Sequence, residues 1–111
     1  MNLLQSLMDG KLAPKAAGHS VPISDPSPRL TPVDGNCYQC GQLSSLTLVN
    51  PPETGLYTIV FRSGSTPTTT VFPISLLGLE RFAAKANTIY EISVLDNRAA
   101  VGAWEVPTDA G

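Results

Sequence analysis

Five prolines interrupt residues 11–36 and constrain the fold of this part of the chain more than any other feature. They are Pro14, Pro22, Pro26, Pro28 and Pro32. A proline has no backbone N–H and pushes the residue before it toward extended geometry, so neither a helix nor a central strand is expected here. We predict an extended arm, which serves either as a loose linker or as a strap along a neighbouring subunit.

The residues before the arm form one apolar stripe if they are helical. Leu3, Leu4, Leu7 and Met8 fall at positions i, i+1, i+4 and i+5, and Gly10 is a suitable stop. A helix this short is not stable alone in water, so it either docks on a partner or frays. We expect these four residues to anchor the protein in an assembly. Secondary contacts are expected from Val21, Ile23 and Leu30 of the arm.

From Leu43 onward, apolar and polar residues alternate with a period of two, which is typical of half-buried strands. Strands are expected at 42–49, 56–61, 66–73, 89–95 and 99–106, with the second and third paired as a hairpin. The low share of charged residues, 14%, and the 19 glycines and prolines also favour strands and turns over helices. Between the third and fourth strands, residues 74–87 suit a brief helix or an irregular flap over one end of the sheet.

These patterns predict an all-β fold, a small antiparallel β-sandwich or open barrel of about five strands. An extended proline-rich arm and a short N-terminal helix precede it. The expected division is 1–36 for the helix and anchoring arm, 37–107 for the β module and 108–111 for a flexible tail.

Charges are too few and too scattered for a nucleic-acid partner, because phosphate binding needs a basic stripe. The seven basic residues are Lys11, Lys15, Arg29, Arg62, Arg81, Lys85 and Arg98. No membrane partner and no Sec-type export are expected, since no apolar run reaches the roughly 18 residues of a membrane span and a signal-type N-terminus is lacking. A small protein with so few charges is expected to be covered in part by copies of itself or by a larger assembly.

The two cysteines, Cys37 and Cys40, raise the question of metal or redox chemistry. Their spacing fits half of a zinc site, but zinc takes four ligands and His19 is the single histidine, so another chain would have to complete the site. A redox pair needs a βαβ unit that this sequence does not supply, whereas a local disulfide stays open for an extracellular location. We favour two small apolar residues at the entry to the first strand, with no metal and no cofactor.

Groups suited to catalysis are also few. His19 lies in the arm rather than on a rigid element, and Glu91 and Glu105 fall at outward strand positions where a solvated charge is ordinary. No segment has the spaced glycines and lysine of a phosphate-binding loop. We therefore predict that the chain is not an enzyme.

Hydroxyl and aromatic side chains around the third strand raise one further alternative. A sugar-binding face could form from Tyr57, Thr68, Thr70 and Trp104. The interpretation that we favour is a solvent-facing threonine row beside an aromatic core.

The stretch from Tyr57 to Trp104 contains a two-part pattern, which is Phe-x-Ser-Gly-x-Thr-Pro-Thr-Thr with a proline-ended strand, and then Ala-Asn-x-x-Tyr-Glu-Ile-Ser. The residues of this pattern are Phe61, Ser63, Gly64, Thr66, Pro67, Thr68, Thr69 and Pro73, followed by Ala86, Asn87, Tyr90, Glu91, Ile92 and Ser93. On these residues the stretch resembles a small β module of bacteriophage and prophage virion proteins. The segment after Pro73 is more apolar than in such modules, and only a short arm precedes the match.

This resemblance implies a structural module at the periphery of a virion, in a tail appendage, baseplate-associated protein, head fibre or decoration. We expect a late, non-enzymatic virion component assembled in the bacterial cytoplasm. Its expected partners are itself, as a homo-oligomer such as a trimer, and other virion proteins. The alternative is a host-surface carbohydrate-binding or adsorption module.

Overall fold

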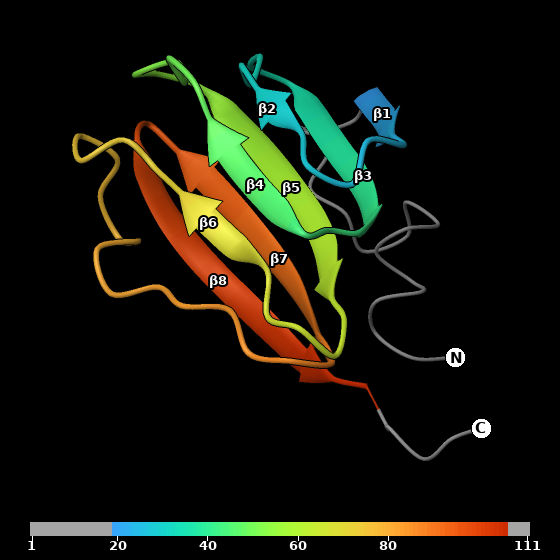
Figure 1. The fold of residues 1–111 in the computed structure, drawn as a ribbon. Coiled ribbons are helices and arrows are strands. Elements are labelled where there is room, and N and C mark those ends of the chain that lie inside the picture. Colours follow the sequence, from blue (N-terminus) through green and yellow to red (C-terminus); the bar gives the residue numbers. More distant parts are fainter. Residues whose placement is uncertain (1–18, 107–111) are drawn as a thin grey trace.

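The computed structural model describes residues 19–106 and shows an all-β body built of two packed sheets (Figure 1). Within these residues there is no helix. The strands are β1 (His19–Ile23), β2 (Arg29–Leu30), β3 (Asn36–Gln42), β4 (Ser45–Leu48), β5 (Leu56–Ser63), β6 (Thr69–Val71), β7 (Thr88–Leu95) and β8 (Arg98–Glu105). The all-β prediction is therefore confirmed. The expected N-terminal helix and the flexible tail lie outside the described residues.

The first six strands alternate between the two sheets, so the chain winds as a flattened coil with one strand in each sheet per turn. β1, β3 and β5 pair in parallel in one sheet, and β2, β4 and β6 pair in parallel in the other. β7 and β8 then add to β5 as an antiparallel pair, which gives the orders β1-β3-β5-β7-β8 and β2-β4-β6. The prediction of about five antiparallel strands is wrong, because period two does not distinguish parallel from antiparallel pairing.

The expected hairpin between the second and third predicted strands does not form, because β5 and β6 lie in different sheets. A buried corner joins them. Ser63 Oγ accepts a hydrogen bond from the Thr68 amide at 2.7 Å and donates to Thr68 Oγ1 at 2.9 Å. Thr68 Oγ1 in turn donates to the carbonyl of Leu43 at 2.7 Å. These bonds replace a hairpin turn and redirect the chain into the other sheet.

The second half of the predicted arm belongs to this body rather than to a neighbouring subunit. β1 pairs along β3, and β2 pairs along β4. Leu30 is buried in the core, and Val21 and Ile23 pack half-buried against it. These three side chains were expected as secondary anchoring contacts, but the chain uses them for its own core. Proline is compatible with this because β1 is an edge strand.

A single hydrophobic core lies between the sheets, and the alternation within β7 correctly places Tyr90, Ile92 and Val94 in it. The larger sheet contributes Tyr38, Tyr57, Ile59, Phe61, Tyr90, Ile92 and Val94, and the smaller sheet contributes Leu30, Leu46 and Leu48. We call the face of the larger sheet that carries these residues its inner face. Its outer face carries the intervening residues of each strand.

Residues 72–87 form the irregular flap that the sequence allowed, without a helix. Leu76 and Leu79 are buried in the core, and Phe82 packs against Tyr90 with ring centroids 5.1 Å apart. The Lys85 amide donates to the Tyr90 hydroxyl at 2.7 Å. The flap therefore lies over the inner face of β7, beyond the last strand of the smaller sheet.

Candidate functional site

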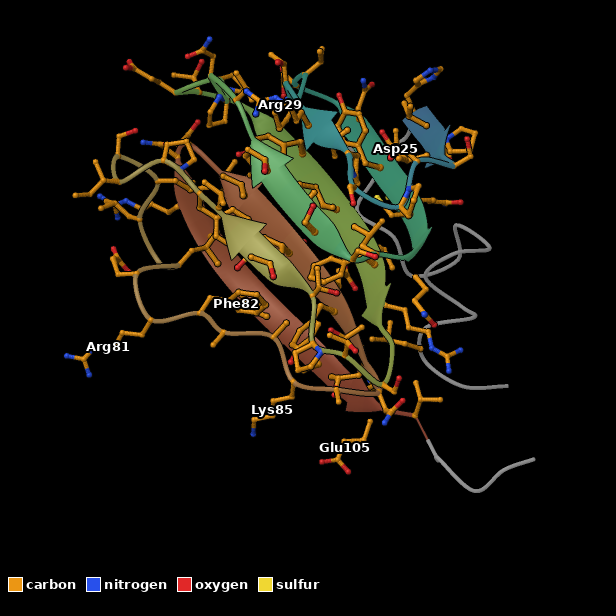
Figure 2. The ribbon with its side chains drawn as sticks, in the orientation of Figure 1. Asp25, Arg29, Arg81, Phe82, Lys85 and Glu105 are labelled. Atoms are coloured by element: carbon orange, nitrogen blue, oxygen red, sulfur yellow. The ribbon has the colours of Figure 1, made fainter. Side chains whose placement is uncertain are left out.

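Two shallow grooves flank Phe82, one on each side of the flap. Figure 2 shows that Phe82 points toward the strands, whereas the neighbouring Arg81 points away from the body. The first groove, about 440 Å³, lies between β6 and the flap. It is lined by Thr70, Phe72, Pro73, Ile74, Leu76, Leu79, Glu80 and Phe82. Its lining is mainly apolar, and Ile74 is 96% exposed at its rim.

The second groove, about 390 Å³, lies between the flap and the inner face of β7 and β8. The five-stranded sheet is wider than the three-stranded one, so the inner face of β8 is left partly uncovered. Val101 is 40% exposed there. The lining is Arg81, Phe82, Ala83, Lys85, Thr88, Tyr90, Val101, Ala103 and Glu105.

Among the described residues that line the first groove, Glu80 is the one ionisable group, and its carboxylate accepts hydrogen bonds from backbone amides. Hydrogen bonds from its own amide and from the Gly78 amide hold the pKa of this carboxyl below its ordinary value. The Gly78 amide lies 3.1 Å from Glu80 Oε2. A carboxylate that is ionised and held in a local turn is suited to fixing the flap, not to general acid or base catalysis.

A third surface is the outer face of the larger sheet, where Cys37, Glu91 and Trp104 lie. The register places Glu91 between Val60 and Gly102, and the ring of Trp104 lies over Gly102, since an added Cβ there would be 3.1 Å from Trp104 Cη2. Burial raises the pKa of the Glu91 carboxyl. Burial, and then the charge of Glu91, raises the pKa of the Cys37 thiol. This thiol is therefore less nucleophilic than an ordinary cysteine.

The structure does not bring the predicted sugar-binding residues together. Tyr57 is fully buried in the core and Thr68 is buried in the corner, so neither belongs to a surface. Thr70 lines the first groove from the smaller sheet, and Trp104 lies on the outer face of the larger one. The alternative of one ligand face from these four residues is therefore wrong, because two of them are buried and the other two lie on different sheets.

The two cysteines lie on opposite faces of β3, because residues three apart in a strand point to opposite sides. Cys37 is on the outer face, and Cys40 packs against the core. Burial, and then the charge of Cys37, raises the pKa of the Cys40 thiol to about 11. His19 shares the inner side with Cys40 but pairs with Asn36 at the other end of β1, so roughly 13 Å of strand separates the two positions. Over residues 19–106 no three metal-ligating side chains cluster, and both thiols are free.

The grooves on either side of the flap are features that the sequence did not indicate. They arise because the two sheets differ in width, and strand number per sheet is not encoded in local alternation. In the described part of the chain, no helix has the length and apolar character required to span a bilayer. Comparison with protein-family models, curated proteins and solved structures finds no match to this chain.

Proposed function

We propose that this protein is a structural, non-enzymatic subunit of a bacteriophage virion, assembled in the host cytoplasm and displayed at the particle surface. In this proposal, residues 1–18 fasten the subunit to other virion proteins and residues 19–106 form the displayed body. The anchoring residues are Leu3, Leu4, Leu7 and Met8, since the chain's own core uses Val21, Ile23 and Leu30.

The observation that carries this proposal is that the residues of the virion-module resemblance serve the fold. Ser63 and Thr68 form the buried corner, and Phe61 stacks on Tyr90 with centroids 5.4 Å apart. Asn87 adopts a left-handed φ of 53° just before β7. A pattern whose members hold a scaffold together is what a structural module requires, and it supports a role in architecture.

The ionisable groups of the described surfaces also favour a structural role. Burial raises the pKa of the Cys37 thiol and of the Glu91 carboxyl, and the Glu80 carboxylate is held by backbone amides. None of these environments activates a nucleophile near neutral pH. The adsorption alternative retains only Thr70 and Trp104, which lie on different sheets, so we do not propose it as the main function.

The proposal is tested on purified particles from the bacterium that carries this gene. Mass spectrometry should find the chain at a constant ratio to the main shell or tail protein. A variant lacking residues 1–18 should keep the far-UV circular dichroism of a β protein but be absent from particles. Deleting 1–36 is unsuitable, because it would remove β1 and β2. A chain that stays in the cleared lysate, or a truncated chain incorporated at the full level, would refute the assignment.

The matched control keeps the length of the chain. Replacing Leu3, Leu4, Leu7 and Met8 together with serine should reduce incorporation as strongly as the deletion does. Replacing Lys11 and Lys15 with serine should leave incorporation unchanged. If both sets leave incorporation unchanged, the length of the segment matters and not its apolar stripe; an equal loss from both sets would show that the apolar stripe is not specifically required.

A further inference from the structure

β8 is the rim of the larger sheet (Figure 1), and over residues 19–106 most of its outward backbone groups have no hydrogen-bond partner. The direction of its N–H and C=O groups follows from two bonds. The Val106 amide donates to the Asn87 carbonyl, so even-numbered residues face β7, and the Ala99 amide donates to the Leu77 carbonyl, so odd-numbered residues face outward. Within residues 19–106, the backbone groups of Val101, Ala103 and Glu105 have no partner.

The flap closes the other end of this rim. Leu77 exchanges hydrogen bonds with Asn97 and Ala99, and Gly78 approaches so closely that an added Cβ would lie 2.5 Å from the Ala99 carbonyl oxygen. Gly78 also has a left-handed φ of 98°, which glycine adopts without strain. The open part of the rim therefore begins after Ala99 and runs to Glu105.

The opposite rim of the same sheet is protected. β1 is parallel to β3, and the His19 amide donates to the Gly35 carbonyl, so Ser20 and Pro22 are the residues that face outward. Proline has no N–H to offer, and an outward-facing proline is a common means of preventing edge-to-edge association. Of the two rims, one carries this protection and the other does not.

Between its charged ends, Arg98 and Glu105, β8 also lacks the other features that discourage pairing. Between Arg98 and Glu105 every residue is uncharged, and β8 pairs with β7 without a register shift along its whole length. Neither lysine, proline nor a bulge interrupts this edge strand, which makes it a template for another strand.

We propose that two copies of this chain join through their β8 edges, antiparallel and related by a two-fold axis at Ala103. This arrangement pairs Ala103 with its counterpart and Val101 with the partner's Glu105, so all three outward residues of each copy exchange hydrogen bonds. The hydrogen-bonded pairs join odd-numbered residues of both copies, and all of these lie on the inner face of their own sheet. Residues directly opposite each other in an antiparallel pair point to the same side, so the inner faces of the two sheets lie on the same side of the dimer. A centre nearer Val101 would place the partner strand against Leu77, which already occupies that end.

The side chains are compatible with this junction. On the inner face, the junction brings together Ala103 of both copies, next to the grooves that leave Val101 exposed. Because Pro22 blocks the other rim, the pairing closes at two copies instead of continuing as a filament. The proposal does not depend on the virion assignment.

The first test uses the full chain and its Ala103→Pro variant. Multi-angle light scattering after size exclusion should give about twice the 11.7 kDa chain mass for the wild type and a single chain mass for the variant. Ala103→Pro removes one outward N–H and leaves the bonds to β7, so the circular dichroism spectrum should be unchanged. A wild-type chain that stays monomeric at its highest soluble concentration overturns the proposal, and so does a variant that remains dimeric.

The second test establishes the register without relying on a proline. Ala103→Cys should form a disulfide-linked dimer on mild oxidation, since paired residues bring their Cα atoms to about 5.5 Å. Ala100→Cys is the matched control, because its two copies would lie roughly 20 Å apart along the strands. Both variants retain Cys37 and Cys40. Cross-linking through residue 100, or equally through both, overturns the register. A dimer that is absent from phage particles would refute only the proposed function.

Discussion

Tyr57 offers a direct test of the physical reasoning, because its hydroxyl is buried and makes no hydrogen bond within the described residues. The side chain is fully inaccessible, and burial raises its pKa to about 12. A buried hydroxyl without a partner costs roughly 1–3 kcal/mol. Tyr57→Phe removes this cost and deletes only one oxygen atom. We expect the free energy of unfolding to rise by about 1 kcal/mol or more, and Tm to rise by roughly 4 °C or more.

The other two tyrosines provide matched controls, since each hydroxyl accepts hydrogen bonds. Tyr38 Oη accepts from the Val33 amide at 2.9 Å and from Asn36 Nδ2 at 3.2 Å, and Tyr90 Oη accepts from the Lys85 amide at 2.7 Å. Tyr38→Phe and Tyr90→Phe should therefore lower the unfolding free energy by about 0.5–1.5 kcal/mol for each bond lost. Urea denaturation at pH 7 measures all three variants under one condition.

The pH dependence gives an independent signature. An ordinary tyrosine ionises near 10.0, and the folded protein holds the pKa of Tyr57 at about 12. The unfolded chain therefore releases this proton first, so the wild type loses stability as the pH rises from about 10 to 12. The advantage of Tyr57→Phe should increase over that interval. A variant that is less stable than the wild type at pH 7 would refute the reasoning and would indicate that a buried water binds the hydroxyl.

Three further predictions concern other parts of the body. Thr68→Val should lower the unfolding free energy by about 2–3 kcal/mol, because it leaves buried polar groups of the corner unpaired, whereas the control Thr70→Val should change it by less than about 1 kcal/mol in the same urea titration. Glu91→Gln should be more stable than the wild type at pH 7 and equally stable below about pH 4, because burial raises the pKa of the Glu91 carboxyl and the wild type loses stability as the pH rises through that pKa. The same variant should speed the labelling of Cys37 by iodoacetamide, because the charge of Glu91 raises the pKa of this thiol. An unchanged labelling rate would contradict that coupling. Pro22→Ala should restore an outward N–H on β1 and allow species larger than a dimer in light scattering, and a mass equal to that of the wild type at every concentration would contradict edge protection by proline.

The sequence predicts which residues face the core better than it predicts which strands are neighbours. Alternation within β7 identifies Tyr90, Ile92 and Val94 as core residues, because side-chain direction is a local property of a strand. Pairing partners are not local. The segment containing Ser63 and Thr68 has the composition of a hairpin turn. These two residues instead hydrogen-bond to each other, and the Thr68 hydroxyl donates to the carbonyl of Leu43, which precedes β4. No short-range sequence pattern reveals these bonds.

The proline-rich arm shows the same limit of local sequence patterns. Prolines correctly exclude a helix and a central strand, but they do not exclude an edge strand whose proline faces away from the sheet. The predicted ligand face failed for a related reason, since Tyr57 and Thr68 share a surface only if β5 and β6 pair. The outward position of Glu91 follows from alternation, whereas Glu105, which the sequence also places outward, lies on the inner side of β8 and lines the second groove. The grooves beside Phe82 depend on the unequal widths of the sheets.

The arrangement of the strands connects the fold to assembly. A coil of parallel strands leaves an unpaired rim at each end of each sheet, so such a body needs features that prevent further strands from adding to these rims. In the larger sheet, Pro22 closes the first rim, and the antiparallel β7–β8 pair ends the coil but leaves a new rim at β8. The flap covers only the Asn97–Ala99 end of that rim. Over residues 19–106, what remains open is a short segment centred on Ala103 and ending at Glu105, and in the proposed dimer a second copy supplies a strand of matching length and hydrogen-bonding pattern.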